Sequence, residues 1–249
     1  MDDKQLSRYS RHILLPEIDL DGQDKLNTAS VMIIGMGGLG ASVAQTLTAA
    51  GVGHLDIWDF DKVELSNLQR QPLYDTNQVG LAKVAAAVAR LHDINPEVRV
   101  TSHEAEFNYD AAKPHAETVH VILDCTDNYR SRRDINRLAV FLKTPLIAAS
   151  AIRFEGQLMT FLNENGPCYE CIQATSPIRD VACRDVGVLT SEVILMATMQ
   201  AQACLKYILG IGDFNNGQML LHDGISNQQR ALTIAIRADC PICQQNIDS

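Results

Sequence analysis

Two cationic side chains in the first third of the chain could act together on phosphate groups. Arg70 belongs to the polar run Ser66–Gln71, and Lys83 follows it on an alanine-rich stretch. Cations directed at one place neutralise the charge that develops on a leaving pyrophosphate, so this pair suits a nucleoside triphosphate. Most arginines and lysines are solvated surface charges instead. The neighbouring Asn67 and Gln69 favour the triphosphate interpretation over that alternative.

A glycine-rich turn precedes these cations. The apolar run Val31–Ile34 passes directly into Gly35–Gly40, and a second apolar run, Leu55–Trp58, ends in Asp59 and Asp61. A glycine turn between a strand and a helix brings backbone N–H groups close to a phosphate, and an acid after the next strand can bind ribose. The turn alone also fits an NAD- or FAD-binding domain, or a turn that only packs a helix on a strand. Its candidate binding residues are Gly35, Gly37, Gly38 and Gly40.

A third polar group, Asp124–Asn128, closes another apolar run. Ligands of an open parallel sheet lie outside the carboxyl ends of its strands, so Asp127 is well placed to hold Mg²⁺ between its carboxylate and phosphates. An aspartate here could equally cap the next helix. We expect both functions in this segment, with Asp127 as the magnesium ligand and Asn128 as the cap.

Four of the seven cysteines form two Cys-x-x-Cys pairs, Cys168 with Cys171 and Cys240 with Cys243. Two such pairs are typical of a closed tetrahedral zinc site, and less so of a redox dithiol. A closed site offers no catalytic position, so its function is structural. Cys183, beside an arginine in an aperiodic segment, is either a reactive thiol or an inert one. Cys125 and Cys204 are expected to be buried.

The elements that position these groups alternate along the chain. Apolar strand-like runs at 31–34, 55–58, 98–101, 119–124 and 146–150 alternate with helix-like segments that include 80–94 and 130–143. This alternation predicts a doubly wound, mostly parallel Rossmann-like α/β sheet. Runs at 157–162, 218–222 and 230–236 predict an antiparallel C-terminal extension, and 172–186 is expected to be a loop. We expect one domain over 1–249, with an N-terminal helical arm at 1–30, a nucleotide-binding half at 31–150 and a carrier-binding and zinc half at 151–249.

Composition excludes several classes of protein. A net charge of −9 argues against a nucleic-acid partner, since such proteins usually carry a basic stripe. The longest apolar stretch, Val186–Leu209, contains Glu192 and Lys206 and predicts a buried helix, not a membrane span. The mixed, charged segment Met1–Leu20 is no signal peptide, so a cytoplasmic location is expected.

Taken together, these residues resemble the HesA/MoeB/ThiF family of adenylyltransferases, relatives of ubiquitin-activating enzymes. The resemblance extends over nearly the whole chain. The strings Ser-Asn-Leu-Gln-Arg-Gln at 66–71 and Asp-Cys-Thr-Asp-Asn at 124–128 carry most of it, with Arg-Tyr-Ser-Arg-His-Ile at 8–13, Asp-Gly-Gln at 21–23, the glycine turn and both cysteine pairs.

The resemblance implies a homodimer that uses ATP to adenylylate the C-terminal glycine of a ubiquitin-fold sulfur-carrier protein ending in Gly-Gly. The glycine turn would then bind phosphate, Asp59 the ribose, and Asn67, Arg70 and Lys83 the triphosphate. Asp127 would bind Mg²⁺, and Arg11 would reach into the partner subunit's site. The nucleophile is a carboxylate, which is already ionised at neutral pH, so no general base is needed.

The resemblance leaves the pathway open between molybdopterin and thiazole (thiamine) synthesis. Cys183-Arg184 is similar to the thiazole branch, whereas Ala151–Arg153 with Glu155–Gln157 is similar to the molybdopterin branch. Leu189–Val193 departs from the family pattern in a region that helps to shape the carrier groove. No sulfurtransferase domain is recognisable, so a separate sulfurtransferase is expected. Two other functions remain as alternatives, a nicotinamide-dependent oxidoreductase and a catalytically inactive carrier-binding protein.

Overall fold

The computed structural model describes residues 1–163, 166–173, 186–214 and 216–243. Its centre is an eight-stranded sheet in the order β3-β2-β1-β4-β5-β6-β7-β8. The first five strands are parallel and the last three antiparallel, as predicted. The strands are β1 (Ser30–Ile34), β2 (His54–Trp58), β3 (Arg99–His103), β4 (Val121–Asp124), β5 (Leu146–Ile152), β6 (Glu155–Phe161), β7 (Gln218–Asp223) and β8 (Gln228–Thr233).

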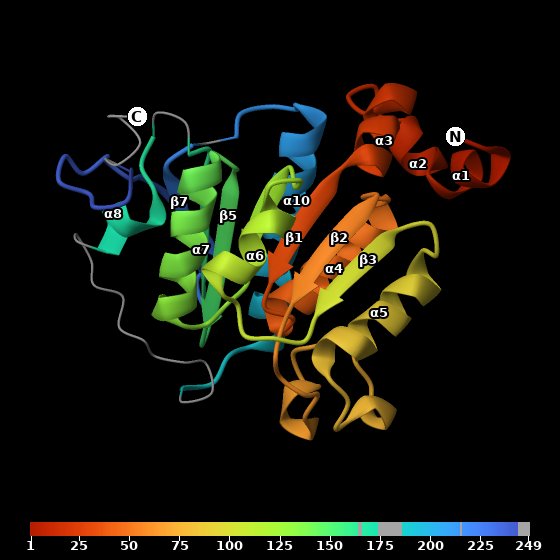
Figure 1. Ribbon diagram of the computed structural model, residues 1–249, viewed down its shortest axis with the longest axis horizontal. Coiled ribbons are helices and arrows are strands. Elements are labelled where there is room, and N and C mark those ends of the chain that lie inside the picture. The colour runs from red at the N-terminus through yellow and green to blue at the C-terminus, as the bar shows by residue number, and fades with distance from the viewer. Residues whose placement is uncertain (164–165, 174–185, 215, 244–249) are drawn as a thin grey trace.

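Helices cover both faces of this sheet (Figure 1). The longer ones are α3 (Asp19–Thr28), α4 (Gly38–Ala50), α5 (Lys83–Ile94), α6 (Tyr109–Ala116), α7 (Tyr129–Leu142) and α10 (Thr190–Leu209). The shorter ones are α1 (Asp3–Arg8), α2 (Ser10–Ile13), α8 (Tyr169–Gln173) and the 3₁₀ turns η1 (Leu65–Asn67) and η2 (Thr76–Gln78). Within the described residues, no helix is long and apolar enough to cross a membrane.

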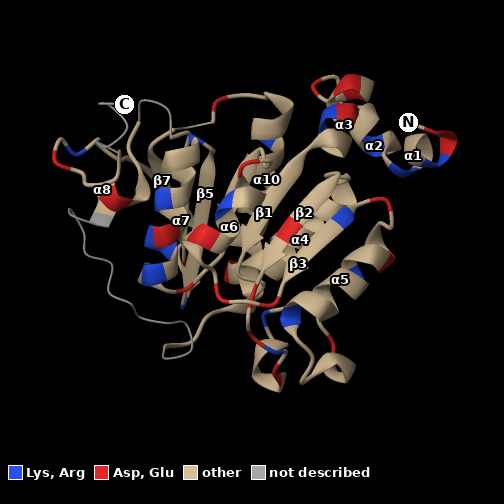
Figure 2. Ribbon diagram, viewed as in Figure 1, with Lys and Arg blue, Asp and Glu red and all other residues tan. Residues whose placement is uncertain are grey.

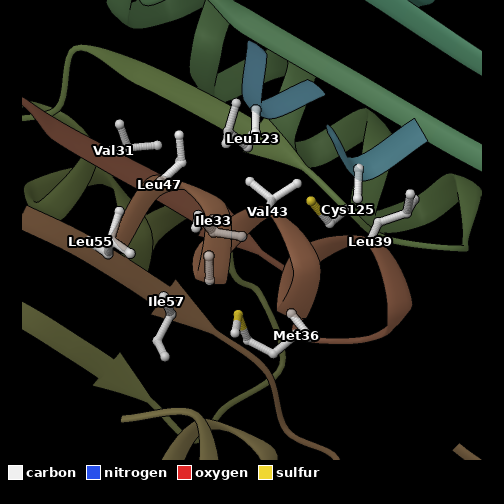
Figure 3. Close-up of a cluster of buried hydrophobic side chains, with 14 of the residues drawn as sticks. Val31, Ile33, Met36, Leu39, Val43, Leu47, Leu55, Ile57, Leu123 and Cys125 are labelled. Carbon is white, nitrogen blue, oxygen red and sulfur yellow. The ribbon is translucent and has the colours of Figure 1, made fainter. Parts of the chain in front are cut away.

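The alternation of side chains along β1 divides the core into two layers. Val31 and Ile33 face α4, α5 and α10, whereas Met32 and Ile34 face α6 and α7. Both faces of β1 are buried, which explains its uninterrupted apolar sequence. Figure 3 shows the first layer, in which Leu39, Val43 and Leu47, four residues apart on α4, pack over β1, β2 and β4.

The predicted boundaries differ from the structure at several elements. The helix expected over 80–94 begins only at Lys83, and the strand expected over 230–236 spans Gln228–Thr233. The prediction did not include α6, although the Asn108 side chain accepts hydrogen bonds from the N–H groups of Asp110 and Ala111 and caps its start. Pro114 lies inside this short helix, and a proline there argues against a helix from sequence alone. Most of the expected loop 172–186 lies outside the described residues.

The N-terminal arm, α1 to α3, lies at the end of the sheet where β1 begins (Figure 1). Tyr9 is buried, and its hydroxyl accepts a hydrogen bond of 2.8 Å from Asn95 Nδ2. Gln23 is fully buried and donates from Nε2 to the Ala50 carbonyl oxygen at 3.0 Å. The arm is therefore fixed to the ends of α4 and α5 by specific polar contacts.

Candidate nucleotide-binding site

A cavity of ≈ 500 Å³ opens at the carboxyl ends of the parallel strands. Its walls include the residues after β1, β2 and β4, where the strand order of the sheet reverses direction. Such a switch point is where open α/β sheets bind ligands. The structure brings ten of the predicted binding residues together in its lining: Gly35, Gly37, Gly38, Asp59, Asp61, Asn67, Arg70, Lys83, Asp127 and Asn128.

The glycine turn passes directly under this cavity. Gly35 has φ +90°, and a Cβ there would lie 2.8 Å from the Cys125 carbonyl oxygen, so the turn requires glycine at this position. Gly37 precedes α4, whose amino end has no side-chain cap. The Tyr74 hydroxyl donates to the Met36 carbonyl oxygen at 2.8 Å and holds the turn in place. Uncapped N–H groups at the start of a 13-residue helix suit a phosphate.

Asp59 braces the turn from the next strand. Its Oδ2 accepts from the Met36 N–H at 2.6 Å, and its Oδ1 accepts from the Asp61 N–H at 2.7 Å. Burial raises the pKa of the Asp59 carboxyl above its usual range, and the charge of Lys83 opposes that shift. A carboxylate has about four acceptor sites, so each oxygen retains capacity for a ligand hydroxyl.

The two predicted cations lie at different depths. Lys83, the first residue of α5, is 5% exposed, and its Nζ lies 2.8 Å from Asp61 Oδ2. Arg70 is half-buried, and its Nη1 donates to the Ser66 carbonyl oxygen at 3.0 Å. Asp61 is exposed, and its carboxylate pairs with Lys83 in the lining of the cavity. Both cations therefore face the cavity that also contains the glycine turn.

The segment after β4 contains the predicted helix cap, Asn128, beside the candidate magnesium ligand Asp127. Asn128 caps α7 by accepting from the Ser131 N–H at 2.9 Å. Asp127 is exposed in the lining of the cavity, where a carboxylate can meet a hydrated cation. Carboxylate oxygen is a hard ligand of the kind that Mg²⁺ prefers.

Sequence reasoning missed several polar residues of the lining, of which Gln71 and Arg132 are large and buried. Gln71 is 3% exposed, and its Oε1 has no hydrogen-bond partner among the described residues. Arg132 is 7% exposed, and its Nη2 donates to the carbonyl oxygens of Thr126 and Ala149. Burial lowers the pKa of Arg132, but Asp124, Tyr169 and Asp127 together outweigh burial and raise the pKa, so the guanidinium stays charged. Basic residues gather on α7 (Figure 2), and Arg132 is the one that is buried beside the cavity.

Three predicted site residues lie outside the lining. Gly40 packs against the turn, since a Cβ there would overlap the Gly35 carbonyl oxygen. The Gln69 Oε1 and carbonyl oxygen each accept from the Thr190 hydroxyl at 2.7 Å, so Gln69 secures the start of α10. Arg11 is exposed on the N-terminal arm, at the opposite end of β1 from the glycine turn (Figure 1). Cys183 lies outside the described residues.

The four cysteines of the two pairs converge at a second place, beside α8. The Sγ atoms of Cys168 and Cys240 are 3.7 Å apart, and those of Cys171 and Cys243 are 3.6 Å apart. All four sulfurs lie within 4.8 Å of one another. In a tetrahedral site with Zn–S bonds of about 2.3 Å, the sulfurs are about 3.8 Å apart. Burial raises the pKa of Cys168 to about 12, so a cation is needed to hold a thiolate here.

Comparison with known proteins identifies the family of this chain. A model of the ThiF family matches residues 9–242. The chain belongs to the ThiF family. It is 42% identical over 245 residues to the sulfur carrier protein ThiS adenylyltransferase of Escherichia coli strain K12, covering 98% of this chain and 97% of that protein.

Other relatives of this ThiF-family chain are longer. It is 39% identical over 249 residues to the adenylyltransferase and sulfurtransferase MOCS3 of Culex quinquefasciatus, covering 99% of this chain but 57% of that protein. Among solved structures, E. coli MccB with ATP superposes with a TM-score of 0.81 at 21% identity, covering 95% of this chain and 74% of MccB. The latter likeness concerns the fold alone.

Proposed function

We propose that this chain catalyses the ATP-dependent adenylylation of the C-terminal glycine carboxylate of a ubiquitin-fold sulfur-carrier protein. The observation that carries the proposal is the cavity in which the start of α4, Lys83, Arg70 and Asp127 meet. The relative of nearly equal length is named as a ThiS adenylyltransferase, which supports the same activity here. A nicotinamide-dependent oxidoreductase is disfavoured by that relationship.

The proposed reaction needs positioning and charge more than proton transfer. The carrier's carboxylate attacks the α-phosphorus of ATP, a P–O bond to the α-phosphorus forms, and the bond to the pyrophosphate oxygen breaks. Lys83 and Arg70 stabilise the charge that moves onto the leaving pyrophosphate. The start of α4 holds phosphate oxygens, and Asp59 orients the ribose. Asp127 would hold Mg²⁺, which neutralises phosphate charge when it is bound.

Exchange of labelled pyrophosphate into ATP tests this activity. With a carrier ending in Gly-Gly, wild-type protein should support exchange, and Asp127→Ala should reduce it by at least ~100-fold, the size of loss typical when one group that stabilises transition-state charge is removed. Asp134→Ala is a matched control, since Asp134 lies on the adjacent helix α7, pairs with Arg137 and is absent from the cavity lining. If no ubiquitin-fold carrier of the same genome supports pyrophosphate exchange, the proposal is wrong.

The carrier belongs to molybdopterin or thiazole synthesis. The relatives compared above carry both associations in their names, through ThiS and through MOCS3. Testing both carriers in the exchange assay separates the two pathways. The faster substrate identifies the pathway, and equal rates would mean that Leu189–Val193 does not discriminate between them.

We place the protein in a homodimer in which Arg11 completes the partner's site. The support is that Arg11 is exposed while its neighbours Tyr9 and His12 are fixed to the chain that carries them. Mixing Arg11→Ala with Asp127→Ala chains should restore roughly a quarter of wild-type activity, since about half the dimers are mixed and each has one intact site. An inactive mixture after confirmed subunit exchange would rule out action between subunits.

The four-cysteine cluster is proposed to hold one structural zinc ion. The sulfur separations support a closed tetrahedral site with no open position for substrate. Zinc there would tie the segment before α8 to the chain beyond β8. Elemental analysis of protein purified without chelator should find one zinc per chain from this cluster.

A further inference from the structure

A cluster of one acid and two histidines lies behind the wall of the nucleotide cavity. It comprises Asp56 of β2, His103 at the end of β3, and His115 of α6. Asp56 is 2% exposed, His103 is half-buried, and the His115 side chain is 40% exposed. The cluster thus has a buried carboxylate at its base and an imidazole open to solvent at its rim.

The three potential ligand atoms converge on one point of space. Asp56 Oδ2 lies 3.2 Å from His103 Nε2 and 3.4 Å from His115 Nδ1, and all three atoms are within 4.8 Å of one another. Ligand atoms bound at about 2.05 Å around a tetrahedral ion are about 3.3 Å apart. The two measured separations therefore already match the edges of such a polyhedron.

The carboxylate is held in place by a partner outside the cluster. Trp58 donates from Nε1 to the other oxygen, Asp56 Oδ1, at 2.6 Å. The Trp58 ring also stacks on the ring of His103, with centroids 3.9 Å apart and an interplanar angle of 15°. Hydrogen bonds that orient a ligand's second atom are characteristic of metal sites, where they fix the direction of the coordinating lone pair.

A third histidine nearby does not join the cluster. His54 places Nδ1 2.8 Å from the Ser30 hydroxyl and Nε2 2.9 Å from the Thr101 hydroxyl, so both of its ring nitrogens already have partners. The set of protein ligands is therefore two imidazoles and one carboxylate, which leaves further positions to water.

We propose that Asp56, His103 and His115 form a binding site for one divalent first-row transition metal ion, separate from both the cysteine cluster and the proposed magnesium site. Imidazole nitrogen favours zinc, copper, iron and nickel over magnesium or calcium. The ion replaces the imidazole N–H groups that otherwise donate to Asp56 Oδ2. Each neutral imidazole then carries its proton on the other ring nitrogen.

The site adjoins the nucleotide cavity through a shared residue. Trp58 lines that cavity while its ring contacts both histidines, edge-on to His115 at 5.8 Å between centroids. Phe107, also in the lining, packs edge-on against Trp58 at 6.2 Å. A bound ion would tie α6 to β2 and β3 and fix this aromatic wall in one position. The inference does not depend on the proposed adenylyltransferase activity.

Trp58 is the only tryptophan of the chain, so all tryptophan fluorescence comes from the residue that this site shares with the wall of the nucleotide cavity. Tag-free protein that carries a single zinc ion per chain, in the cysteine cluster, is titrated with Ni²⁺, whose partly filled d shell quenches a nearby indole. We expect saturable quenching with one ion per chain. His115→Asn should weaken the apparent affinity for Ni²⁺ by at least ~10-fold. Removing only the hydrogen-bond partner of a metal ligand already lowers metal affinity by about that factor, and His115 is a ligand itself.

Two further variants make the result decisive. His92→Asn changes an exposed histidine on α5 outside the cluster and should leave the quenching curve unchanged. His103→Gln, with folding checked by far-ultraviolet circular dichroism, should weaken binding as His115→Asn does. Quenching that does not saturate, or that is equal in wild type and His115→Asn, would show that the cluster is only a hydrogen-bonded network around a buried carboxylate.

Discussion

Replacing Gly51 with alanine should detach the N-terminal arm from the nucleotide-binding half. Gly51 ends α4 with φ +84°, and a Cβ there would lie 2.6 Å from three atoms of the Tyr9 phenol, Cε1, Cζ and Oη. The Tyr9 ring is 4% exposed and cannot move aside without leaving its site. Alanine at position 51 and Tyr9 in its observed place are therefore incompatible.

Three contributions set the size of the effect. An alanine in the left-handed region costs about 1–2 kcal/mol. Displacing a large buried side chain loses about 2–3 kcal/mol of hydrophobic stabilisation. The lost hydrogen bond between the Tyr9 hydroxyl and Asn95 adds about 1 kcal/mol. We expect Gly51→Ala to lower the free energy of unfolding by about 4–6 kcal/mol in total.

Gly210 offers a matched control. It ends α10 in the same way, with φ +71°, but a Cβ there would have no atom within 4 Å. Gly210→Ala should therefore cost only the backbone contribution of about 1–2 kcal/mol. Urea unfolding of the two variants measures the difference, which isolates the docking of Tyr9 from the strain of the turn.

The activity assay adds an independent consequence. An undocked arm cannot present Arg11 to a partner subunit, so pyrophosphate exchange should fall in Gly51→Ala while ATP binding to the cavity persists. Equal destabilisation by Gly51→Ala and Gly210→Ala would refute the proposed contact with Tyr9. Full exchange activity in a Gly51→Ala variant that has lost the arm contact would refute the role assigned to Arg11.

Two other perturbations test the sites themselves. Cys240→Ser should remove zinc from the cysteine cluster and lower the melting temperature, with a smaller effect on pyrophosphate exchange. The control Cys204→Ala, which changes a buried thiol of α10 outside the cluster, should leave the zinc content unchanged. Elemental analysis measures the zinc content of each variant, and thermal unfolding measures its melting temperature. Because burial raises the folded-state pKa of Asp59 above its ordinary value of 3.8, the contribution of Asp59 to stability is present below that value and is lost as the pH rises through the folded-state pKa. Wild type should therefore lose stability relative to Asp59→Asn as the pH rises above 3.8, and a difference that grows in the opposite direction would contradict this assignment.

The sequence predicted those parts of the fold that depend on neighbouring residues in the chain. The apolar runs that became β1, β2 and β4 are buried on both faces, and the glycine turn and the capping Asn128 each have a local geometric cause. These features place the nucleotide cavity, because its lining follows the ends of those strands.

The remaining features depend on contacts between distant segments. Arg132 lies in the helix-like segment 130–143, and nothing in its sequence distinguishes it from the other arginines there. It is buried because the carbonyl oxygens of Thr126 and Ala149 accept its hydrogen bonds. Asp56 and His103 are 47 residues apart and meet because β2 pairs with β3. The sequence spacing of Asp56, His103 and His115 follows no known metal-binding motif. The two Cys-x-x-Cys pairs do follow such a motif, so their site could be predicted from the sequence.

The cysteine cluster also has a consequence for the order in which the chain can be assembled. Cys168 and Cys240 are separated by 72 residues, and the chain between them includes all of α10, which packs on α4. A cross-link that closes a loop of this length restricts the unfolded chain by about 4 kcal/mol. During synthesis from the N-terminus, the nucleotide-binding half emerges first, but the fourth thiol arrives only with Cys243. The proposed zinc ion would therefore bind late, and it would join the segment around α8 to the chain beyond β8 only after the residues of the nucleotide cavity have been made.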